Sequence, residues 1–489
     1  MKLHERVLFL DGKFQERPDV LEVVNPSTAQ VLGHSVEGRA ADIDEAVRIA
    51  QAAFEDKRWT GMDPLERTRT LGRAAELLRE RADDFSAVMS AEMGMTLNFA
   101  AWMEVPMAAS ALDYFGTLIP QPGGVTAPFS LAGPQGEYFS MTVKQPVGVA
   151  GLITPWNFPL LMPVWKVGAA LAAGCPCILK PAPQSPFTAL LLAEVLHEAG
   201  VPEGMLAVIP GSDEAGKALV AHPGVPKIAF TGATETGKHI SRAAAEHLKR
   251  VTLELGGKSA NIFFDDVDLE QAVSGAMFGI FLNSGQVCQA GSRVLVQRGI
   301  YDTFLERLRE RVEGLTTGPA DDFTSDIGPV VSREQYERVR GYLQQGQACG
   351  ARLLTGGQDI SGQGYFVPPT VFADVTPEMP IATEEIFGPV LSVIPFDTEE
   401  EALSIANSTL YGLAGAVWTA DIKRAMRFAR DLRAGTVWVN TYQILSPTLP
   451  FGGFGQSGVG RELGPQALEP YLETKSIIVD LNDTPIQMF

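Results

Sequence analysis

The stretch Val147-Gly-Val-Ala-Gly-Leu-Ile-Thr-Pro-Trp-Asn-Phe-Pro159 sets the fold of this 489-residue chain. It is a short apolar run, 147–153, followed at once by a proline-stiffened turn that carries Asn157. Such a run, bounded by turn residues, is typical of a buried strand. The same order of strand, turn and helix then repeats. We predict further strands at 177–179, 205–209, 227–230 and 251–255, with helices starting at Ser185, near Asp213 and near Glu235.

Strands that alternate with helices of this length predict right-handed crossovers and a parallel sheet covered on both faces. Ligands of such sheets bind at the carboxyl ends of the strands. A second alternating block runs from 261 to about 442, and its helix 268–283 leads into Cys288. Two α/β blocks with a thiol near the start of the second predict a cleft between domains. The strands predicted in this block are 294–297, 390–395, 413–418 and 436–440.

The first hundred residues are predicted to be mainly helical. Asp42, with Glu45 three residues on, has the spacing of a helix N-cap. Asp63 followed by Pro64 predicts a second helix that runs towards Gly94. The proline- and glycine-rich segment 120–136 interrupts this pattern, and 137–144 alternates like an exposed strand, so this insertion is predicted to be an arm. The glycine-rich segment 450–460 is predicted to be an ordered loop, and 477–481 a terminal strand.

Composition excludes several classes of protein. The length favours two or three domains, and 45% apolar with 20% charged residues is typical of a folded globular protein. A net charge of −19 without a basic block argues against nucleic acid and membrane surfaces as partners. The apolar segment 145–165 contains four prolines, so we predict a buried strand and turn there, not a membrane helix. Six dispersed histidines give no metal site.

The cysteines favour a reducing compartment. Four of them, Cys175, Cys177, Cys288 and Cys349, are too few and too scattered for a disulfide framework. Residues 1–17 carry charges throughout and do not read as a secretory signal, and the pair Cys175 and Cys177 leads into an apolar strand and is predicted to be core. A cytoplasmic location is therefore expected.

Cys288 lies in Phe281-Leu-Asn-Ser-Gly-Gln-Val-Cys-Gln-Ala-Gly-Ser-Arg293, where an apolar helix gives way to a strand-like run. A free thiol has a pKa of about 8.5, so it reacts as a nucleophile only where its surroundings favour the anion. We expect the backbone N–H groups of a tight turn to favour it here. Taken alone, a cysteine is more often a buried structural residue, by about three to one.

Groups at other strand ends favour a catalytic role for Cys288. Asn157 offers an amide donor, Lys180 a cation, and Glu254 an acid in an otherwise apolar strand. The segment 230–237 has two glycines that open a helix, where backbone N–H groups bind phosphate. Each feature alone has an ordinary structural explanation: a capped turn, a solvated lysine, a paired acid. Together they form a nucleophile, an oxyanion donor, a base and a dinucleotide site in one cleft.

In the motifs that contain these residues, the chain resembles the NAD(P)-dependent aldehyde dehydrogenase superfamily. The matching motifs appear in the family's order and cover nearly the whole chain. They are Pro155-Trp-Asn-Phe-Pro159, Lys180-Pro-Ala182, Phe230-Thr-Gly232, Leu253-Glu-Leu-Gly-Gly-Lys258, Gly285-Gln-Val-Cys288, Glu384-Glu-Ile-Phe-Gly-Pro389 and Pro450-Phe-Gly-Gly453.

The resemblance implies an α/β aldehyde dehydrogenase-like fold with three parts. A Rossmann-type parallel-sheet domain for NAD(P) would comprise 1–122 and 146–255, and a second α/β domain, the catalytic one, would comprise 256–456. A small β arm for oligomerisation would comprise 123–145 and 471–489. The family's assemblies imply a homodimer or a homotetramer.

The resemblance also implies the reaction. Cys288 would attack an aldehyde as thiolate, and the oxyanion of the thiohemiacetal would be held by the Asn157 amide and the Cys288 backbone N–H. Hydride transfer to the cofactor would leave a thioester, which water activated by Glu254 would hydrolyse to a carboxylate.

The cofactor is expected to be NAD, with NADP possible, because Pro183 stands where many NAD-preferring members have an acid that bonds the ribose 2′-hydroxyl. Ala233 replaces a frequent serine. By resemblance, Lys180 would bond the adenosine ribose, Glu385 the nicotinamide ribose, and Phe387 would pack beside the nicotinamide. The other residues expected along the cofactor are Ile153, Trp156, Gly211, Gly232, Ala233 and Leu255.

The substrate is expected to be a hydrophobic aliphatic or aromatic aldehyde, since the family's pocket positions are mostly apolar here and include no arginine. They are Phe158, Met162, Trp165, Val287, Gln289, Leu445 and Phe451. Three alternatives stay open. A CoA-acylating semialdehyde dehydrogenase would have no use for Glu254 as a base. A cysteine hydrolase or acyltransferase would need a histidine beside the thiol. An inert relative would keep the fold without turnover.

Overall fold

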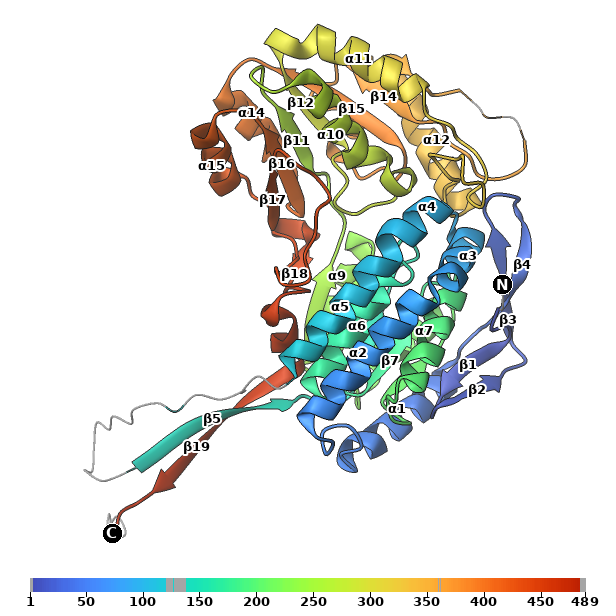
Figure 1. The fold of residues 1–489 in the computed structure, drawn as a ribbon, viewed down its shortest axis with the longest axis vertical. Helices are drawn as coiled ribbons and strands as arrows, with labels where there is room; N and C mark the ends of the chain where they lie inside the picture. Colours follow the sequence, from blue (N-terminus) through green and yellow to red (C-terminus); the bar gives the residue numbers. More distant parts are fainter. Residues whose placement is uncertain (1–2, 120–125, 127–137, 359, 361, 484–489) are drawn as a thin grey trace.

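The computed structural model describes residues 3–119, 126, 138–358, 360 and 362–483, and its elements form two parallel-sheet lobes and a projecting arm (Figure 1). The first sheet has the order β18-β10-β9-β6-β7-β8-β1-β2, and its five central strands run parallel. All five strands predicted in the first block are confirmed, with small differences at their ends. The strands are β1 (Val7–Leu10), β2 (Lys13–Glu16), β6 (Ala150–Ile153), β7 (Cys177–Lys180), β8 (Leu206–Val208), β9 (Lys227–Thr231), β10 (Arg250–Glu254) and β18 (Gly458–Val459).

Helices cover both faces of this sheet, as the alternation predicts. Ile178 packs into the core under one group of helices and Leu179 into the core under the other, because successive side chains of a strand point to opposite faces. One face carries α1 (Ala40–Glu55), α8 (Asp213–Ala221) and α9 (Thr234–Ala245). The other carries α2 (Pro64–Glu80), α3 (Ala82–Met93), α5 (Val105–Leu118), α6 (Leu161–Ala173) and α7 (Pro186–Glu198) (Figure 1).

The prediction of a mainly helical N-terminal segment is wrong for its first third. β1 and β2 form a hairpin whose two-residue turn is Asp11-Gly12, with φ of +49° and +73°. An Asp-Gly pair between alternating residues is the strongest short-range hairpin signal, and it was available in the sequence. A second antiparallel pair follows, β3 (Val20–Asn25) with β4 (Gln30–Val36).

The helix starts are partly as predicted. Asp63 caps α2 by accepting the N–H of Leu65 at 2.8 Å, which confirms that prediction. Asp42 is not an N-cap: α1 begins after Arg39, and the Asp42 carboxylate accepts the Arg39 N–H from the first turn at 2.9 Å. The second helix also ends earlier than predicted, because the chain breaks at Arg81 before α3.

The apolar segment 145–165 contains the predicted strand and turn, β6 and the loop after it, and also the start of an unpredicted helix, α6. Pro163 lies in the first turn of α6, where backbone N–H groups have no intrahelical partner, so proline costs little there. Among the helices that the structure describes, none is both long enough and apolar enough to cross a bilayer.

The second sheet has the order β13-β14-β15-β12-β11-β16-β17 and is parallel except for β13. The four strands predicted in this block are confirmed as β12, β15, β16 and β17, whereas β11, β13 and β14 were missed. Its strands are β11 (Ala260–Phe263), β12 (Arg293–Gln297), β13 (Arg352–Thr355), β14 (Thr370–Ala373), β15 (Val390–Phe396), β16 (Ala414–Trp418) and β17 (Thr436–Val439). Its helices are α10 (Leu269–Phe281), α11 (Tyr301–Glu313), α12 (Arg333–Ala348), α13 (Pro380–Thr383), α14 (Glu399–Ala406) and α15 (Ile422–Asp431).

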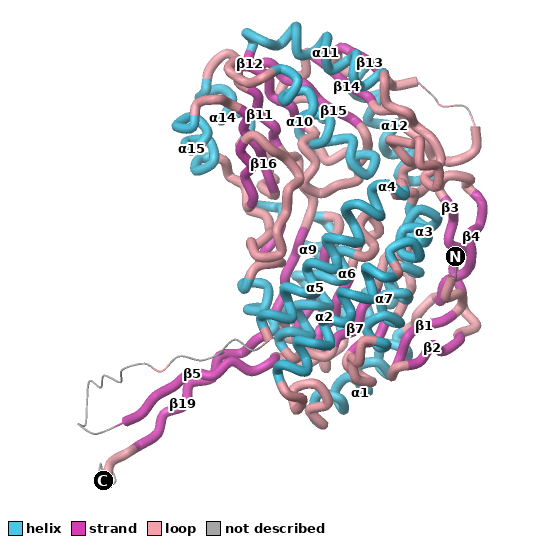
Figure 2. The backbone as a smooth tube through the Cα atoms, viewed as in Figure 1, coloured by secondary structure: helices cyan, strands magenta, loops and turns pink. Residues whose placement is uncertain are grey.

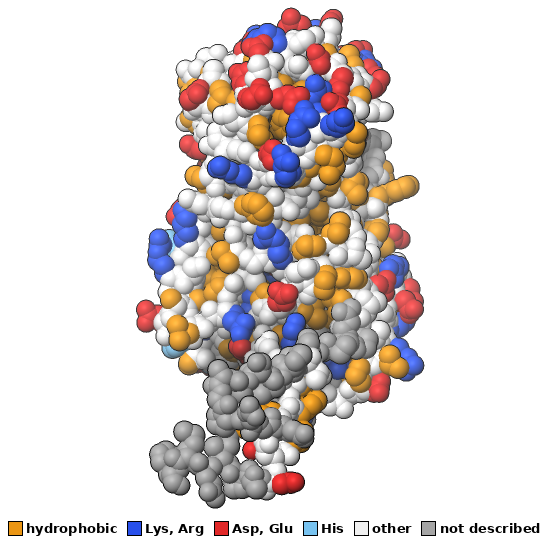
Figure 3. Space-filling model, turned by 90° about the vertical axis from the view of Figure 1, so that its left-hand side faces the viewer, with side chains coloured by type: hydrophobic (Ala, Val, Ile, Leu, Met, Phe, Trp, Pro, Cys, Tyr) orange, Lys and Arg blue, Asp and Glu red, His pale blue; other side chains and the backbone are white. Residues whose placement is uncertain are grey.

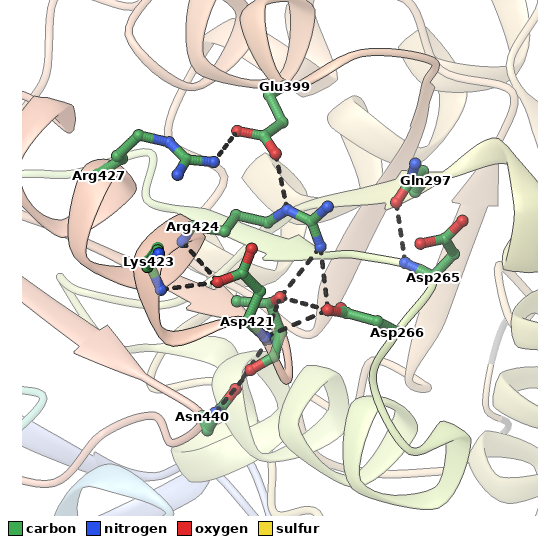
Figure 4. Close-up of polar contacts among 10 residues, drawn as sticks. Asp265, Asp266, Gln297, Glu399, Asp421, Lys423, Arg424, Arg427 and Asn440 are labelled. Atoms are coloured by element: carbon green, nitrogen blue, oxygen red, sulfur yellow. Dashed lines mark hydrogen bonds and ion pairs between the residues drawn. The ribbon is translucent and has the colours of Figure 1, made fainter.

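Internal ion pairs fill the carboxyl end of this second sheet (Figure 4). Arg424 of α15 donates to Asp266 beyond β11 at 3.0 Å and to Glu399 beyond β15 at 2.8 Å. Its guanidinium also lies 4.4 Å from the centre of the Phe264 ring. In many parallel sheets the side chains at this end bind a ligand. Here the charged side chains at this end bind one another instead. Cys288 precedes β12 and lies at the opposite, amino end, which faces the first sheet.

An arm extends away from both lobes (Figures 1 and 2). β5 (Tyr138–Pro146) and β19 (Leu472–Asp480) pair antiparallel along their whole length. This confirms the predicted exposed strand near 137–144 and the terminal strand, which begins earlier than predicted. Of the predicted arm, 123–145 and 471–489, residues 123–125, 127–137 and 484–489 lie outside the described residues.

Candidate active site

The turn that carries Cys288 is built from left-handed backbone. After α10, a short helix η2 (Leu282–Gly285) contains Asn283 and Ser284 with φ of +47° and +55°. Gly285 follows with φ of +72°, and a Cβ there would meet the Gly388 carbonyl oxygen at 2.1 Å, so only glycine fits. This turn ends the apolar helix and presents the thiol of Cys288, which is partly buried, to the space between the two lobes.

Asn157 joins the first lobe to this turn. It follows β6, is buried, and its Nδ2 donates to the carbonyl of Gln286 at 2.9 Å. Asn283 Nδ2 donates in return to the Asn157 carbonyl at 2.9 Å. An amide nitrogen has two N–H groups, so one remains for a ligand oxygen beside the thiol.

Glu254 ends β10 and is buried beside a second acid. Its Oε1 lies so close to Gly452 that an added Cβ would be 2.7 Å away, and its Oε2 has no hydrogen-bond partner among the described residues. Glu462 and Lys166 form a buried ion pair nearby. Burial and then the charge of Glu462 raise the pKa of Glu254 well above its usual range, although Lys166 opposes this.

Two cavities meet at Cys288 and Glu254. The larger, about 270 Å³, is here called the polar cavity because Gln335, Arg338 and Glu385 lie in its wall. The smaller, about 30 Å³, is here called the apolar cavity because aromatic and aliphatic side chains form most of its wall, although Gln289, Gln443 and Glu462 also line it. Both are also lined by Met162 and Thr231. The thiol and the acid therefore stand between two cavities, an arrangement suited to a reaction between two different bound molecules.

The polar cavity collects most of the residues predicted to hold the cofactor. Trp156, Gly232, Ala233, Leu255, Glu385 and Phe387 all line it, together with Asn157. The Trp156 and Phe387 rings meet edge to face with centroids 5.3 Å apart. Helix α9 starts at this wall after Ala233 without a side-chain cap, so its first N–H groups remain available to a phosphate.

Glu385 is placed by contacts with the segment between β10 and β11. It accepts the Gly257 N–H at 3.1 Å, and a Cβ on Gly256 would lie 2.3 Å from its Oε2. Burial raises its pKa to about 7. Three features of this wall fit a dinucleotide. They are the Glu385 carboxylate packed against Gly256, the aromatic pair of Trp156 and Phe387, and the uncapped start of α9.

The remaining predicted cofactor residues lie at neighbouring strand ends, outside this cavity's wall. Ile153 and Lys180 are paired across β6 and β7, and Gly211 follows β8. Burial lowers the pKa of Lys180 to about 8, while the charges of Asp213 and Glu37 raise it. These three residues therefore continue the same carboxyl edge of the sheet.

The apolar cavity collects six of the seven predicted pocket residues: Phe158, Met162, Trp165, Gln289, Leu445 and Phe451. Val287 is different, because it is buried in the core of the second lobe. The left-handed turn before it rotates the chain, and sequence alone gives no measure of that rotation. One wall was missed entirely: Phe99, Met103 and Met107, which recur every four residues and so share a helix face. That spacing was a usable signal.

Three positioning residues were also missed. Glu104, in the single π-helical turn η1 (Ala100–Glu104) before α5, accepts the N–H groups of Leu160 and Leu161 at 3.3 and 2.9 Å. Burial raises the pKa of Glu104 to about 8. On α12, Gln335 donates to the Phe387 carbonyl and Arg338 to the Glu385 carbonyl, each at 2.6 Å.

These two contacts hold a strained segment. Phe387 has φ of +63°, a left-handed conformation that is costly for a side chain of this size. Such strain persists only where neighbours hold the chain, and Gln335 and Arg338 of α12 supply that hold.

The expectation of a stabilised thiolate is wrong for this state of the site. Burial, followed by the charges of Glu254 and Glu385, raises the pKa of the Cys288 thiol to about 12. The N–H groups of Gln289 and Cys288 lower it, as the turn predicts, but burial outweighs them. Attack by the sulfur therefore requires removal of its proton within the site.

Comparisons with known proteins agree with this geometry. The model of the aldehyde dehydrogenase family matches residues 14–477. The DhaS protein of Bacillus subtilis (strain 168) is 46% identical, over 97% of this chain and 96% of that protein. A betaine aldehyde dehydrogenase of Rhizobium etli (strain CIAT 652) is 44% identical, over 98% of each. The NAD+ complex of an aldehyde dehydrogenase from Bacillus cereus superposes with a TM-score of 0.95 and 43% identity, covering 98% of this chain and 97% of that one. The chain belongs to the aldehyde dehydrogenase family.

Proposed function

We propose that the chain oxidises a hydrophobic aliphatic or aromatic aldehyde to its carboxylate, with NAD+ as the second substrate. The observation that carries this proposal is the position of Cys288 and Glu254 in the walls of both cavities. The aldehyde enters the apolar cavity and the dinucleotide the polar one. Each then reaches the sulfur from its own side.

Cys288 is the nucleophile. Its sulfur bonds to the aldehyde carbon, and the carbonyl oxygen becomes an oxyanion. The free N–H of the Asn157 amide and the backbone N–H of Cys288 hold that oxyanion. Loss of one such donor costs roughly 3 kcal/mol of transition-state stabilisation. The bond between Asn157 and Gln286 supports this role, because it fixes the amide against the turn that carries the thiol.

The dinucleotide is held by Trp156, Glu385, Phe387 and the start of α9, with Lys180 at the adenosine end. When bound, it supplies the hydride acceptor. NAD+ is supported by the bound cofactor of the Bacillus cereus relative. Although Pro183 replaces the usual acid, Glu37 and Asp213 place negative charge near Lys180, and Glu37 is fixed by the Ser212 hydroxyl at 2.6 Å. This charge repels a 2′-phosphate.

Glu254 is the base for the second half of the reaction. Water attacks the carbonyl carbon of the Cys288 thioester while Glu254 takes a proton from that water. The carbon–sulfur bond then breaks, which releases the carboxylate and regenerates the Cys288 thiol. Burial and the charge of Glu462 raise the pKa of Glu254, so this carboxylate binds a proton more readily than that of an ordinary glutamate. A CoA-acylating enzyme would need no such base.

Betaine aldehyde is a second candidate substrate, because the Rhizobium etli relative bears that name. Aromatic rings attract a quaternary ammonium group, and Trp165 and Phe451 meet in the apolar cavity with ring centroids 5.5 Å apart. Comparison of kcat/KM for betaine aldehyde and hexanal discriminates the two. We expect hexanal to be preferred.

We propose that the arm joins two or four copies of the chain. β5 and β19 form a two-stranded sheet of their own, with a further bridge from Met141 of β5 to Thr126, and the arm exposes Phe139, Ile478 and Val479. On the face in Figure 3, hydrophobic side chains gather across the middle of the molecule, above the arm. Exposed apolar side chains that gather on one face are often covered by a partner. Light scattering on the purified protein tests this. All four cysteines are free, which supports a cytoplasmic location.

The reaction is tested by the absorbance of the reduced cofactor without CoA, for wild type and Cys288→Ala. Turnover that is lost in the variant supports the proposal. A wild type that reacts only when CoA is added would contradict the role of Glu254. A wild type that reacts with no aldehyde under either condition would indicate an inert relative.

A further inference from the structure

The side chain of Gln286 joins the turn that carries the thiol to the start of α12. Gln286 precedes Cys288 by two residues and is fully buried. Its Oε1 accepts the N–H of Val331 at 2.9 Å, and its Nε2 donates to the carbonyl of Asn283 at 3.3 Å. Val331 comes directly before Ser332, the N-cap residue of α12. One amide therefore fixes the turn internally and connects it to the first residues of a helix.

The segment that leads into α12 lies between the two lobes. Val331 packs with the buried residues of the first lobe, whereas Val330 packs with those of the second. A second bond, from Ser284 Oγ to the carbonyl of Gly328 at 2.9 Å, joins the same turn to this segment farther from the helix. A buried N–H group that loses its acceptor is costly, so the Val331 N–H holds the start of α12 against Gln286.

One face of α12 then holds the chain around the two residues proposed to bind the nicotinamide end of the cofactor, Glu385 and Phe387. Besides the bonds to their carbonyls, a hydroxyl of α12 donates to Glu384 Oε2 at 2.8 Å, and a Cβ on Gly388 would lie 2.5 Å from a side chain of α12. The residues of α12 that make these contacts recur at the spacing of helix turns. They are Gln335, Arg338, Val339 and Tyr342.

These contacts close into a ring. The carbonyl oxygen of Gly388 lies against Gly285, where a Cβ would be 2.1 Å from it, and Gly285 is next to Gln286 in the chain. The ring fixes the separation of Cys288 and Phe387, which both line the polar cavity. Gln286 is not one of the described residues that line either cavity at the thiol. Any effect of its side chain on a ligand must therefore pass through its neighbours.

We propose that Gln286 is a positioning residue that sets the nicotinamide end of the cofactor site relative to the Cys288 sulfur, through the start of α12. This inference rests on the proposed function, since it assumes that Glu385 and Phe387 bind the cofactor. Hydride transfer requires the two reacting carbons to be in near contact, and a misplacement of about 1 Å can cost about 100-fold in rate. A residue that sets this separation therefore affects the rate as well as cofactor affinity.

A comparison of NAD+ with AMP tests the proposal by binding alone. Gln286→Met has a similar volume but removes both side-chain bonds. We expect calorimetry to show a rise of about fivefold or more in the Kd for NAD+, with the Kd for AMP, which occupies only the Lys180 end, within about twofold of wild type. Equal rises for NAD+ and AMP would show that the whole first lobe is disturbed and would overturn the proposal.

Tyr301→Phe is the matched control. It also removes an acceptor of a backbone N–H group, since the Tyr301 hydroxyl accepts the N–H of Asp374 at 2.8 Å. This bond lies at the carboxyl end of the second sheet, whereas Cys288 lies at the amino end. The control should bind NAD+ and AMP like wild type. A rise in the Kd for NAD+ equal to that of Gln286→Met would contradict a specific route through α12.

A double-mutant cycle with Gln335→Met tests the route itself. If Gln286 acts through α12, the double variant should have a Kd for NAD+ close to that of the weaker-binding single variant. A Kd that rises by the product of the two single factors would mean that the residues act independently and would overturn the proposal.

The rate gives a further readout that a change in affinity alone would not produce. At saturating NAD+ and hexanal, the burst of reduced cofactor should be at least about tenfold slower in Gln286→Met than in wild type and unchanged in Tyr301→Phe. If Gln286→Met does not fold, Gln286→Asn takes its place, because its amide is one methylene too short to reach Val331. A wild type that binds NAD+ with an affinity that neither Gln286 variant alters would overturn this inference and leave the proposed function intact. A wild type that bound no NAD+ would contradict the proposed function and this inference with it.

Discussion

The Nδ2 of Asn157 donates to the carbonyl of Gln286, two residues before Cys288, at 2.9 Å. This bond connects the end of β6 in the first lobe to the thiol-bearing turn of the second. Because it uses only one of the two N–H groups of the amide, the other remains free in the cavity wall that Asn157 shares with Cys288. The contact therefore connects the two lobes and fixes the orientation of the amide that we propose as the oxyanion donor.

Asn157→Ala should lower kcat by about 100-fold to 1,000-fold, since an oxyanion donor is lost. Asn283→Gly is the matched control: it removes the donor to the Asn157 carbonyl but suits the φ of +47° at that position. Steady-state kinetics with hexanal should show a much smaller loss for the control. Equal losses of kcat in the two variants would mean that Asn157 acts only by connecting the two lobes.

The reaction should accelerate as pH rises through the neutral range. The raised pKa of Glu254 means that its carboxylate, the active form of the base, is lost as pH falls through that pKa. The raised pKa of Cys288 acts in the same direction, because the thiolate increases with pH. A kcat profile that is flat from about pH 6 to about pH 9 would contradict both assignments.

Glu462→Gln should move the acid limb of that profile to lower pH, because the negative charge that raises the pKa of Glu254 is removed. Lys166 then lacks its partner, and a buried unpaired charge is strongly destabilising. The double variant of Glu462→Gln with Lys166→Met has no such unpaired charge, so it can be assayed. The acid limb of its kcat profile should still move to lower pH. The shift should be smaller than that from the loss of Glu462 alone, because the charge of Lys166, which lowers the pKa of Glu254, is also absent.

Glu104 should make the fold less stable as pH rises. Its pKa is 4.5 ordinarily and about 8 when buried, so between these values the unfolded chain has released a proton that the folded chain retains. Stability then falls with pH and the loss is complete above about 8. Thermal unfolding of Glu104→Gln should show a smaller fall in Tm across this range than wild type. The exposed control Glu246→Gln should match wild type.

Gly256→Ala should raise the Kd for NAD+ by about tenfold or more, because the added Cβ displaces the Glu385 carboxylate. Fluorescence titration with NAD+ measures this without turnover. Gly72→Ala is the control, since a Cβ there meets nothing within 4 Å. Unchanged affinity in Gly256→Ala would remove Glu385 from the cofactor site.

Much of the site could be predicted from sequence because its groups follow apolar strands or interrupt them. Asn157 and Glu254 stand at the carboxyl ends of β6 and β10, and parallel strands bring such ends together. Cys288 precedes β12 at the amino end of the second sheet, so its motif predicts its role but strand order does not predict its place. Glu104, Gln335 and Arg338 could not be predicted this way. They act through packing between helices distant in sequence, which local patterns do not encode.

The errors have similar causes. Val287 was placed in the pocket because the rotation produced by the left-handed residues Asn283 and Ser284 is invisible in sequence. The raised pKa of Cys288 depends on burial and on two acids from other elements. The Asp11-Gly12 hairpin, by contrast, has a clear local signal, which the prediction of a mainly helical N-terminal segment overlooks.

In the proposed reaction Cys288 carries the acyl group and Glu254 releases it to water. Rapid mixing of Glu254→Gln with NAD+ and hexanal, without CoA, separates these two steps. We expect a burst of reduced cofactor of about one equivalent per site, then little turnover, and a mass increase on Cys288 equal to the acyl group. Steady turnover at the wild-type rate, or the absence of any acyl adduct on Cys288, would contradict it.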